Sequence, residues 1–136
     1  MVDETNAVVT VVAQCRSRAG AGDVVASLLA AHVTASQAEA GCISFRAYRD
    51  AADPDQFALH EQYVDERALL EHRQSTHFAR YFAGGIVPLL LDRAWSRYAE
   101  IPAAGAVRRE RSLWERKRYG QHRNERPRDR RPDSRA

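Results

Sequence analysis

Three of the five histidines lie between residues 55 and 82, close to an acidic residue and a phenol. Gln56 to Val64 alternates in the way of a strand, so Glu61 and Tyr63 share one face with Phe57 and Leu59, while His60 lies on the other. If the first face is turned toward the helices, a carboxylate and a phenol enter an apolar layer beneath His72.

A carboxylate in such a layer needs a partner, because an unpaired buried charge is costly. We expect Glu61 to pair with His72. A Glu–His pair fixes the tautomer of the imidazole and is typical of a general base. The alternative is that the pair only satisfies two buried polar groups.

His77 follows His72 by five residues, which on an unbroken helix places it about 140° away. Ser75-Thr76 interrupts the helical pattern and could reset that phase, which would bring His77 to the same site as Glu61, Tyr63 and His72. A capping or surface role is the alternative.

Aromatic and histidine side chains predict a small pocket around these catalytic candidates. Each of them could equally be part of the hydrophobic core. None of the histidines shows metal-ligand spacing, and no phosphate-binding or dinucleotide-binding glycine motif is present, so we expect no metal and no cofactor. The expected pocket residues are His32, Phe45, Phe57, Phe78, Phe82 and Trp95.

The hydrophobic periodicity predicts the element order β-α-β-β-α-β. Asp23 is the expected cap of the first helix, Asp65 begins the second, and Gly84-Gly85 ends it. The apolar segment 86–91, broken by Pro88, has no assigned place. The expected elements are strands at 7–16, 42–49, 56–64 and 92–101, with helices at 23–39 and from 66 onward.

This order predicts an α+β, ferredoxin-like fold with a four-stranded antiparallel sheet and both helices on one face. The first strand is apolar on both faces, and the third and fourth carry large residues on both. A bare second face would expose an apolar patch, so we expect a homodimer with two sheets packed face to face, a dimeric α/β barrel.

The charge divides the chain in two. Residues 1–103 have nine arginines against thirteen acidic residues, a net charge of −4, whereas residues 104–136 have a net charge of +7. We expect 1–103 to form the domain and 104–136 to be a disordered basic tail. We expect no nucleic-acid partner except through that tail, for which a solvated appendage is the alternative. The chain shows no membrane span and no secretory signal, which predicts a cytoplasmic protein.

Several segments resemble the antibiotic biosynthesis monooxygenase family, whose members include quinol monooxygenases. They are Arg16 to Gly20, Glu39 to Phe45, Phe57 to Tyr63, Ala68 to His72 and Ser75 to Phe78. The resemblance implies a ferredoxin-like homodimer that oxidises phenols, quinols or polycyclic aromatic compounds with O₂ and without flavin, haem or metal. It implies site roles for Glu61, Tyr63, His72 and His77.

Departures from the family pattern are Tyr63 in place of a common tryptophan and Thr76 in place of a common proline. Phe82 stands where the haem-degrading branch has a ligating histidine, which speaks against haem. Function does not follow from the fold. A non-redox isomerase, or a ligand-binding dimer of the stress response, remains an alternative.

Overall fold

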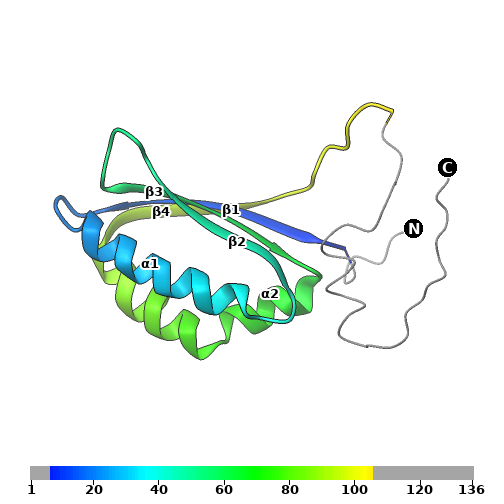
Figure 1. The fold of residues 1–136 in the computed structure, drawn as a ribbon, viewed down its shortest axis with the longest axis horizontal. Helices are drawn as coiled ribbons and strands as arrows, with labels where there is room; N and C mark the ends of the chain where they lie inside the picture. The colour runs from blue at the N-terminus through cyan, green and yellow to red at the C-terminus, as the bar shows by residue number, and fades with distance from the viewer. Residues whose placement is uncertain (1–6, 106–136) are drawn as a thin grey trace.

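The computed structural model describes residues 7–105, and the expected tail lies almost wholly outside this range. Figure 1 shows the strands side by side in one layer with both helices on the same side of it. The elements are β1 (Val9–Ser17), α1 (Gly22–Gln37), β2 (Cys42–Arg49), β3 (Gln56–Tyr63), α2 (Glu66–Arg73), the π-helix η2 (Phe78–Ile86), the 3₁₀ turn η3 (Val87–Leu89) and β4 (Leu90–Tyr98).

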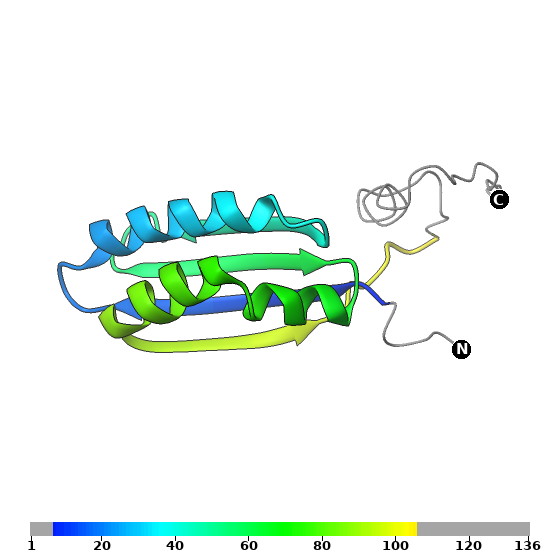
Figure 2. The same ribbon diagram turned by 90° about the horizontal axis from the view of Figure 1, so that it is seen from below.

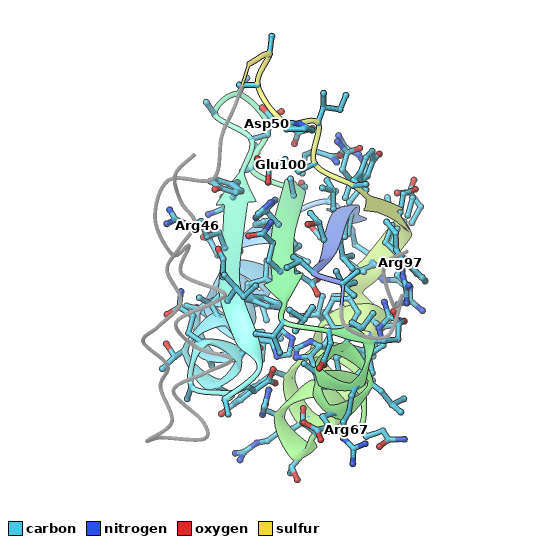
Figure 3. The ribbon with its side chains drawn as sticks, turned by 90° about the vertical axis from the view of Figure 1, so that its right-hand side faces the viewer. Arg46, Asp50, Arg67, Arg97 and Glu100 are labelled. Carbon is cyan, nitrogen blue, oxygen red and sulfur yellow. The ribbon has the colours of Figure 1, made fainter. Side chains whose placement is uncertain are left out.

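The four strands form one open antiparallel sheet in the order β2-β3-β1-β4. This confirms the expected α+β, ferredoxin-like fold. β2 and β4 are the two edges, and Figure 3 shows Arg46 on one and Arg97 on the other. In a single chain the sheet does not close into a barrel.

The helices cover the face to which the odd-numbered residues of β3 point. Along β3 every second residue is buried, from Phe57 through Leu59 and Glu61 to Tyr63. Figure 2 shows α1 over the β2 side of the sheet and α2 with η2 beside it over the β1 side. Of the two faces that the sequence left open, the one with Glu61 and Tyr63 therefore lies beneath the helices.

A carboxylate from the β2–β3 turn holds the start of α1. Asp55 Oδ1 accepts hydrogen bonds from Gly22 N (3.0 Å) and Ser17 Oγ (3.2 Å). A side chain at Gly22 would put its Cβ 2.2 Å from Pro54 O, so glycine is needed there. The expectation that Asp23 caps this helix is wrong, because its carboxylate pairs with Arg49 instead (2.9 Å).

The second helical segment has a cap, a break and a continuation. Asp65 Oδ1 accepts from Ala68 N (2.9 Å), which is the expected cap. Gly84-Gly85 does not end the segment, since η2 runs through both glycines to Ile86. There η3, with Pro88, turns the chain into β4.

β4 starts two residues earlier and ends three residues earlier than expected, at Leu90 and Tyr98. Its register pairs Ala13 with Trp95 and Thr10 with Tyr98, so Trp95 and Tyr98 lie on opposite faces as expected.

The face of the sheet without helices is mixed rather than apolar. Exposed Tyr48 and Tyr98 share it with His60, Gln62 and other polar side chains. The expected large apolar patch is therefore smaller than the sequence suggested. None of the helical segments within residues 7–105 has the length and hydrophobicity of a membrane span.

Candidate functional site

Glu39 is the centre of a polar cluster beneath the second helical segment. Its Oε2 atom lies 2.8 Å from His72 Nδ1 and 2.6 Å from His77 Nε2. His72 is 2 % exposed, while Glu39 and His77 are 18 % and 20 % exposed. One carboxylate oxygen thus holds two imidazoles at the margin between core and solvent.

Close packing between a loop and a helix brings Glu39 to His72. Gly41 follows α1, and a side chain there would place its Cβ 2.5 Å from Ala68 Cβ, so α2 rests directly on the glycine. Gly41 O also accepts from Val64 N (2.9 Å). Ala68 and His72 lie one turn apart on α2, and Glu39 precedes Gly41 by two residues, so this contact sets the Glu39–His72 distance.

Ser75 resets the helical phase as expected. Its Oγ donates to His72 O (2.7 Å) and accepts from Phe78 N (3.1 Å), which ends one helical segment and caps the next. His77 consequently points to the same carboxylate as His72, although an unbroken helix would have separated them.

Glu61 and His72 do not form the expected hydrogen bond. The Tyr63 hydroxyl donates to Glu61 Oε1 (2.7 Å), and His72 takes Glu39 instead. Burial raises the pKa of Glu61, while the hydrogen bond from Tyr63 and nearby positive charge oppose that rise. Burial and the neighbouring Glu61 carboxylate raise the pKa of Tyr63 above its ordinary value.

His32 is a third imidazole beside His72 and His77, and it is buried. Its ring centroid lies 5.3 Å from that of His72 and 5.6 Å from that of His77. Burial, and then the two neighbouring histidines, lower the pKa of His32 to about 3, so this imidazole is neutral at neutral pH. Its Nδ1 has no hydrogen-bond partner within residues 7–105.

A cavity of about 190 Å³ lies between the sheet and the second helical segment. Six expected site residues line it: His32, Glu61, His72, Phe78, Phe82 and Trp95. Phe45 and Phe57 do not. They face a separate groove under α1, and Phe45 backs the cavity by packing on His32 (5.2 Å between centroids) and His72 (5.4 Å). Tyr63 and His77 also lie behind the lining.

The cavity wall carries two arginines that the sequence analysis did not select. The Arg73 guanidinium lies 4.5 Å from the centroid of the Trp95 ring, and that of Arg93 lies 5.8 Å from the Phe82 ring. Within the described part of the chain neither arginine has a carboxylate partner. The cavity thus has a positive wall of two guanidinium groups beside the Glu61 carboxyl, whose pKa is raised by burial and lowered in part by Arg73, and this wall favours a ligand that is or becomes an anion.

The sequence analysis also missed Glu39 as a site residue. It lies 33 positions from its partner His72, so spacing alone carries no signal. The nearest indication is Gly41, since a glycine after a helix can mark a close backbone approach. With His72 and His77, Glu39 also supplies a donor set that could hold a metal ion.

Comparison with known proteins gives consistent matches. The model of the antibiotic biosynthesis monooxygenase family matches residues 8–84. "Putative monooxygenase Rv0793" of Mycobacterium tuberculosis is 39 % identical over 75 residues, covering 55 % of this chain and 73 % of that protein.

Solved structures with a similar fold also match this chain. The structure of Rv0793 has a TM-score of 0.65 at 32 % identity, covering 72 % of this chain and 99 % of that one. The crystal structure of PA3566 from Pseudomonas aeruginosa has a TM-score of 0.66 at 28 % identity, covering 73 % and 99 %. The family model thus spans the part of the chain that contains Glu39, His72 and His77, and both structural matches extend over more than 70 % of the chain.

Proposed function

This chain belongs to the antibiotic biosynthesis monooxygenase family, and we propose that it oxidises a small phenol or quinol with O₂ without a resident cofactor, using His72 as general base. The observation that carries the proposal is the 2.8 Å contact of Glu39 Oε2 with His72 Nδ1 at the wall of the cavity. Glu39 is a positioning residue in this proposal, and His72 is the catalytic one.

The contact with Glu39 selects one tautomer of His72. A carboxylate oxygen can only accept, so Nδ1 must carry the hydrogen. The lone pair of the neutral ring is then on Nε2, which makes no hydrogen bond within the described residues. Since His72 lines the cavity, Nε2 is the atom available to take a proton from a bound phenol.

The positive wall supports the same step. A phenol gives up its proton only near pH 10 in water, so the anion has to be stabilised in the site. Arg73 and Arg93 supply charge at the cavity, and they lie against the rings of Trp95 and Phe82. The aromatic surfaces would hold the ring of the substrate while the guanidinium groups stabilise its charge.

Conversion of a phenol into a quinone, or of a quinol into a hydroxyquinone, balances with O₂ alone. The phenol loses two hydrogens and gains one oxygen atom, and the second oxygen atom leaves with those hydrogens as water. The electrons come from the substrate, whose anion is the species that reacts with O₂. The protein has to bind the ring, remove the proton and exclude water from the anion.

The cavity volume favours a substrate of one or two rings. At about 190 Å³ it is somewhat larger than an apolar cavity of ~150 Å³ that accepts benzene. Trp95, which is 51 % exposed, forms the outer wall, so a larger polycyclic compound would require this wall to move.

The remaining expected site residues have supporting roles in the proposal. The Glu61–Tyr63 pair supplies a polar group at the cavity floor, and the raised pKa of Glu61 favours its neutral form there. His32 lines the cavity, and its buried Nδ1 has no partner within residues 7–105. His77 holds the same Oε2 atom of Glu39 that His72 contacts.

Proteins of this family are commonly dimeric. We propose that two copies pair through the sheet face that has no helices, with one cavity in each protomer. Exposed Tyr48 and Tyr98 would be buried in that interface.

Incubation with hydroquinones and naphthols of one and two rings under ¹⁸O₂ tests this function. The proposal predicts oxygen uptake and a product that gains one ¹⁸O atom. A rearranged product of unchanged mass would indicate an isomerase and overturn it. If a ligand stabilises the protein but no product forms, the protein is a binding protein and the proposed oxygenase activity is also overturned.

A further inference from the structure

The Glu39 cluster brings three potential metal-ligating atoms close together. Glu39 Oε2, His72 Nδ1 and His77 Nε2 all lie within 4.8 Å of one another. Two imidazole nitrogens and one carboxylate oxygen form a donor set that suits divalent transition metals, whereas Mg²⁺ and Ca²⁺ prefer oxygen ligands.

The distances require only a small adjustment for a metal ion. Zinc binds imidazole nitrogen at about 2.0–2.1 Å and carboxylate oxygen at about 2.0–2.2 Å, so tetrahedral ligands lie about 3.3 Å apart. The two oxygen–nitrogen distances here are 2.8 and 2.6 Å. The Glu39–His72 and Glu39–His77 separations would therefore have to widen by about 0.5 and 0.7 Å.

Access and open coordination positions are also present. Glu39 and His77 are partly exposed, so an ion can enter from solvent and keep water ligands, while His72 anchors the site in the core. The packing of Gly41 on Ala68 and the capping by Ser75 already hold the loop and both histidines in place. The ligands are thus largely preorganised, so little conformational entropy is lost in ordering them when an ion binds.

We propose that Glu39, His72 and His77 form a binding site for a divalent transition-metal ion such as Zn²⁺. While the metal is bound, His72 cannot act as the general base. Coordination through Nδ1 requires a lone pair on that atom, which moves the ring proton to Nε2. The site would therefore be inhibitory rather than catalytic. This last step rests on the proposed function, whereas the binding of metal does not.

Calorimetric titration of the full-length, EDTA-treated chain with ZnCl₂ tests the binding. We expect one site of micromolar affinity, weakened at least tenfold by His77→Gln and by Glu39→Gln. His60→Gln is the matched control, because His60 lies on the opposite face of the sheet, and should bind as the wild type does. Equal affinity of the wild type and His77→Gln would overturn the site.

A second measurement needs no variant. Long-range ¹H–¹⁵N spectra of histidine-labelled protein report which ring nitrogen carries the proton. We expect the His72 proton on Nδ1 in EDTA and on Nε2 with Zn²⁺, and no tautomer change at His60. Unchanged His72 and His77 signals under excess Zn²⁺ would refute the proposal.

The two proposals fail in different ways. If Zn²⁺ binds at His77 but no hydroquinone is oxidised, the metal site stands and the oxygenase falls. If the protein oxidises hydroquinones at the same rate with and without saturating Zn²⁺, bound metal does not prevent His72 from acting as the base. The inhibitory role is then wrong and the proposed oxygenase activity stands.

Discussion

Glu39 Oε2 lies 2.8 Å from His72 Nδ1, although 33 positions separate the two residues. The acid comes from the loop after α1 and the imidazole from α2, and the same oxygen also holds His77. Because the carboxylate can only accept, it determines which nitrogen of His72 is left for chemistry. The acid from the sheet, Glu61, has a different partner in Tyr63.

Glu39→Gln should weaken catalysis more than it weakens the fold. The amide can present either its oxygen or its NH₂ group to His72, so the tautomer with the hydrogen on Nδ1 is no longer favoured. We expect kcat for hydroquinone oxidation to fall by roughly 10- to 100-fold, a part of what general acid–base catalysis contributes. The position of the ring proton, read from ¹⁵N spectra of His72, should become mixed. An unchanged kcat with a mixed tautomer would show that the tautomer is irrelevant.

Gly41→Ala should destabilise the protein and disturb the site together. The added Cβ would meet Ala68 Cβ at 2.5 Å, and such overpacking costs roughly 1–3 kcal/mol in the free energy of unfolding. Urea unfolding measures the cost, and the His72 ¹⁵N shifts report on the site.

Gly20→Ala is the matched control for that substitution. Gly20 has a φ of +83° and open space around its missing Cβ, so alanine strains the backbone there without touching α2. It should destabilise the fold and leave the His72 signals unchanged. If Gly41→Ala behaved in the same way, the close packing would not be what places Glu39.

Glu61→Gln should change how stability depends on pH. Burial raises the pKa of Glu61 above its ordinary 4.5, so the unfolded chain ionises first as pH rises. The wild type therefore loses stability from about pH 4.5 up to the folded pKa, and the neutral glutamine does not. Urea unfolding between pH 4 and 8.5 should show a growing advantage of Glu61→Gln. A difference that is independent of pH would contradict the raised pKa.

Arg93→Gln should weaken the binding of anions while sparing neutral rings. Hydrogen bonds to charged groups contribute about 1.5–3 kcal/mol, so we expect 2-naphthoate to bind at least tenfold more weakly. Naphthalene-2-carboxamide, a neutral analogue, should bind unchanged. Calorimetry measures both affinities, and Arg73→Gln should act in the same direction.

The control is Arg67→Gln, since Arg67 lies on the exposed side of α2 (Figure 3) and, among the described residues, forms its ion pair with Glu71. Equal loss of affinity for naphthoate in Arg67→Gln and Arg93→Gln would mean that total charge, rather than the cavity wall, attracts the ligand.

The strands and helices could be predicted because their periodicity is local. The alternation from Phe57 to Tyr63 indicated which residues of β3 share a face, and Asp65 marked the start of α2. Gly84-Gly85 misled, because the glycines indicated a helix end where η2 continues to Ile86. Tertiary packing overrides such propensities.

The polar cluster was only half predictable, because contact partners depend on long-range packing. His72, His77 and Glu61 could be recognised from residue type and spacing, but Glu39 reaches them only through the contact of Gly41 with Ala68. Arg93 could not be found either, since its place on the cavity wall follows from the register of β4 against β1.

The most direct test of the account is the rate of oxygen uptake by His72→Gln. With the best hydroquinone substrate of the wild type, we predict a loss of about 10²- to 10⁴-fold in kcat, the range typical of general acid–base catalysis. His60→Gln, altered on the opposite face of the sheet, should retain the wild-type rate. Oxygen uptake by His72→Gln at the wild-type rate would contradict the account.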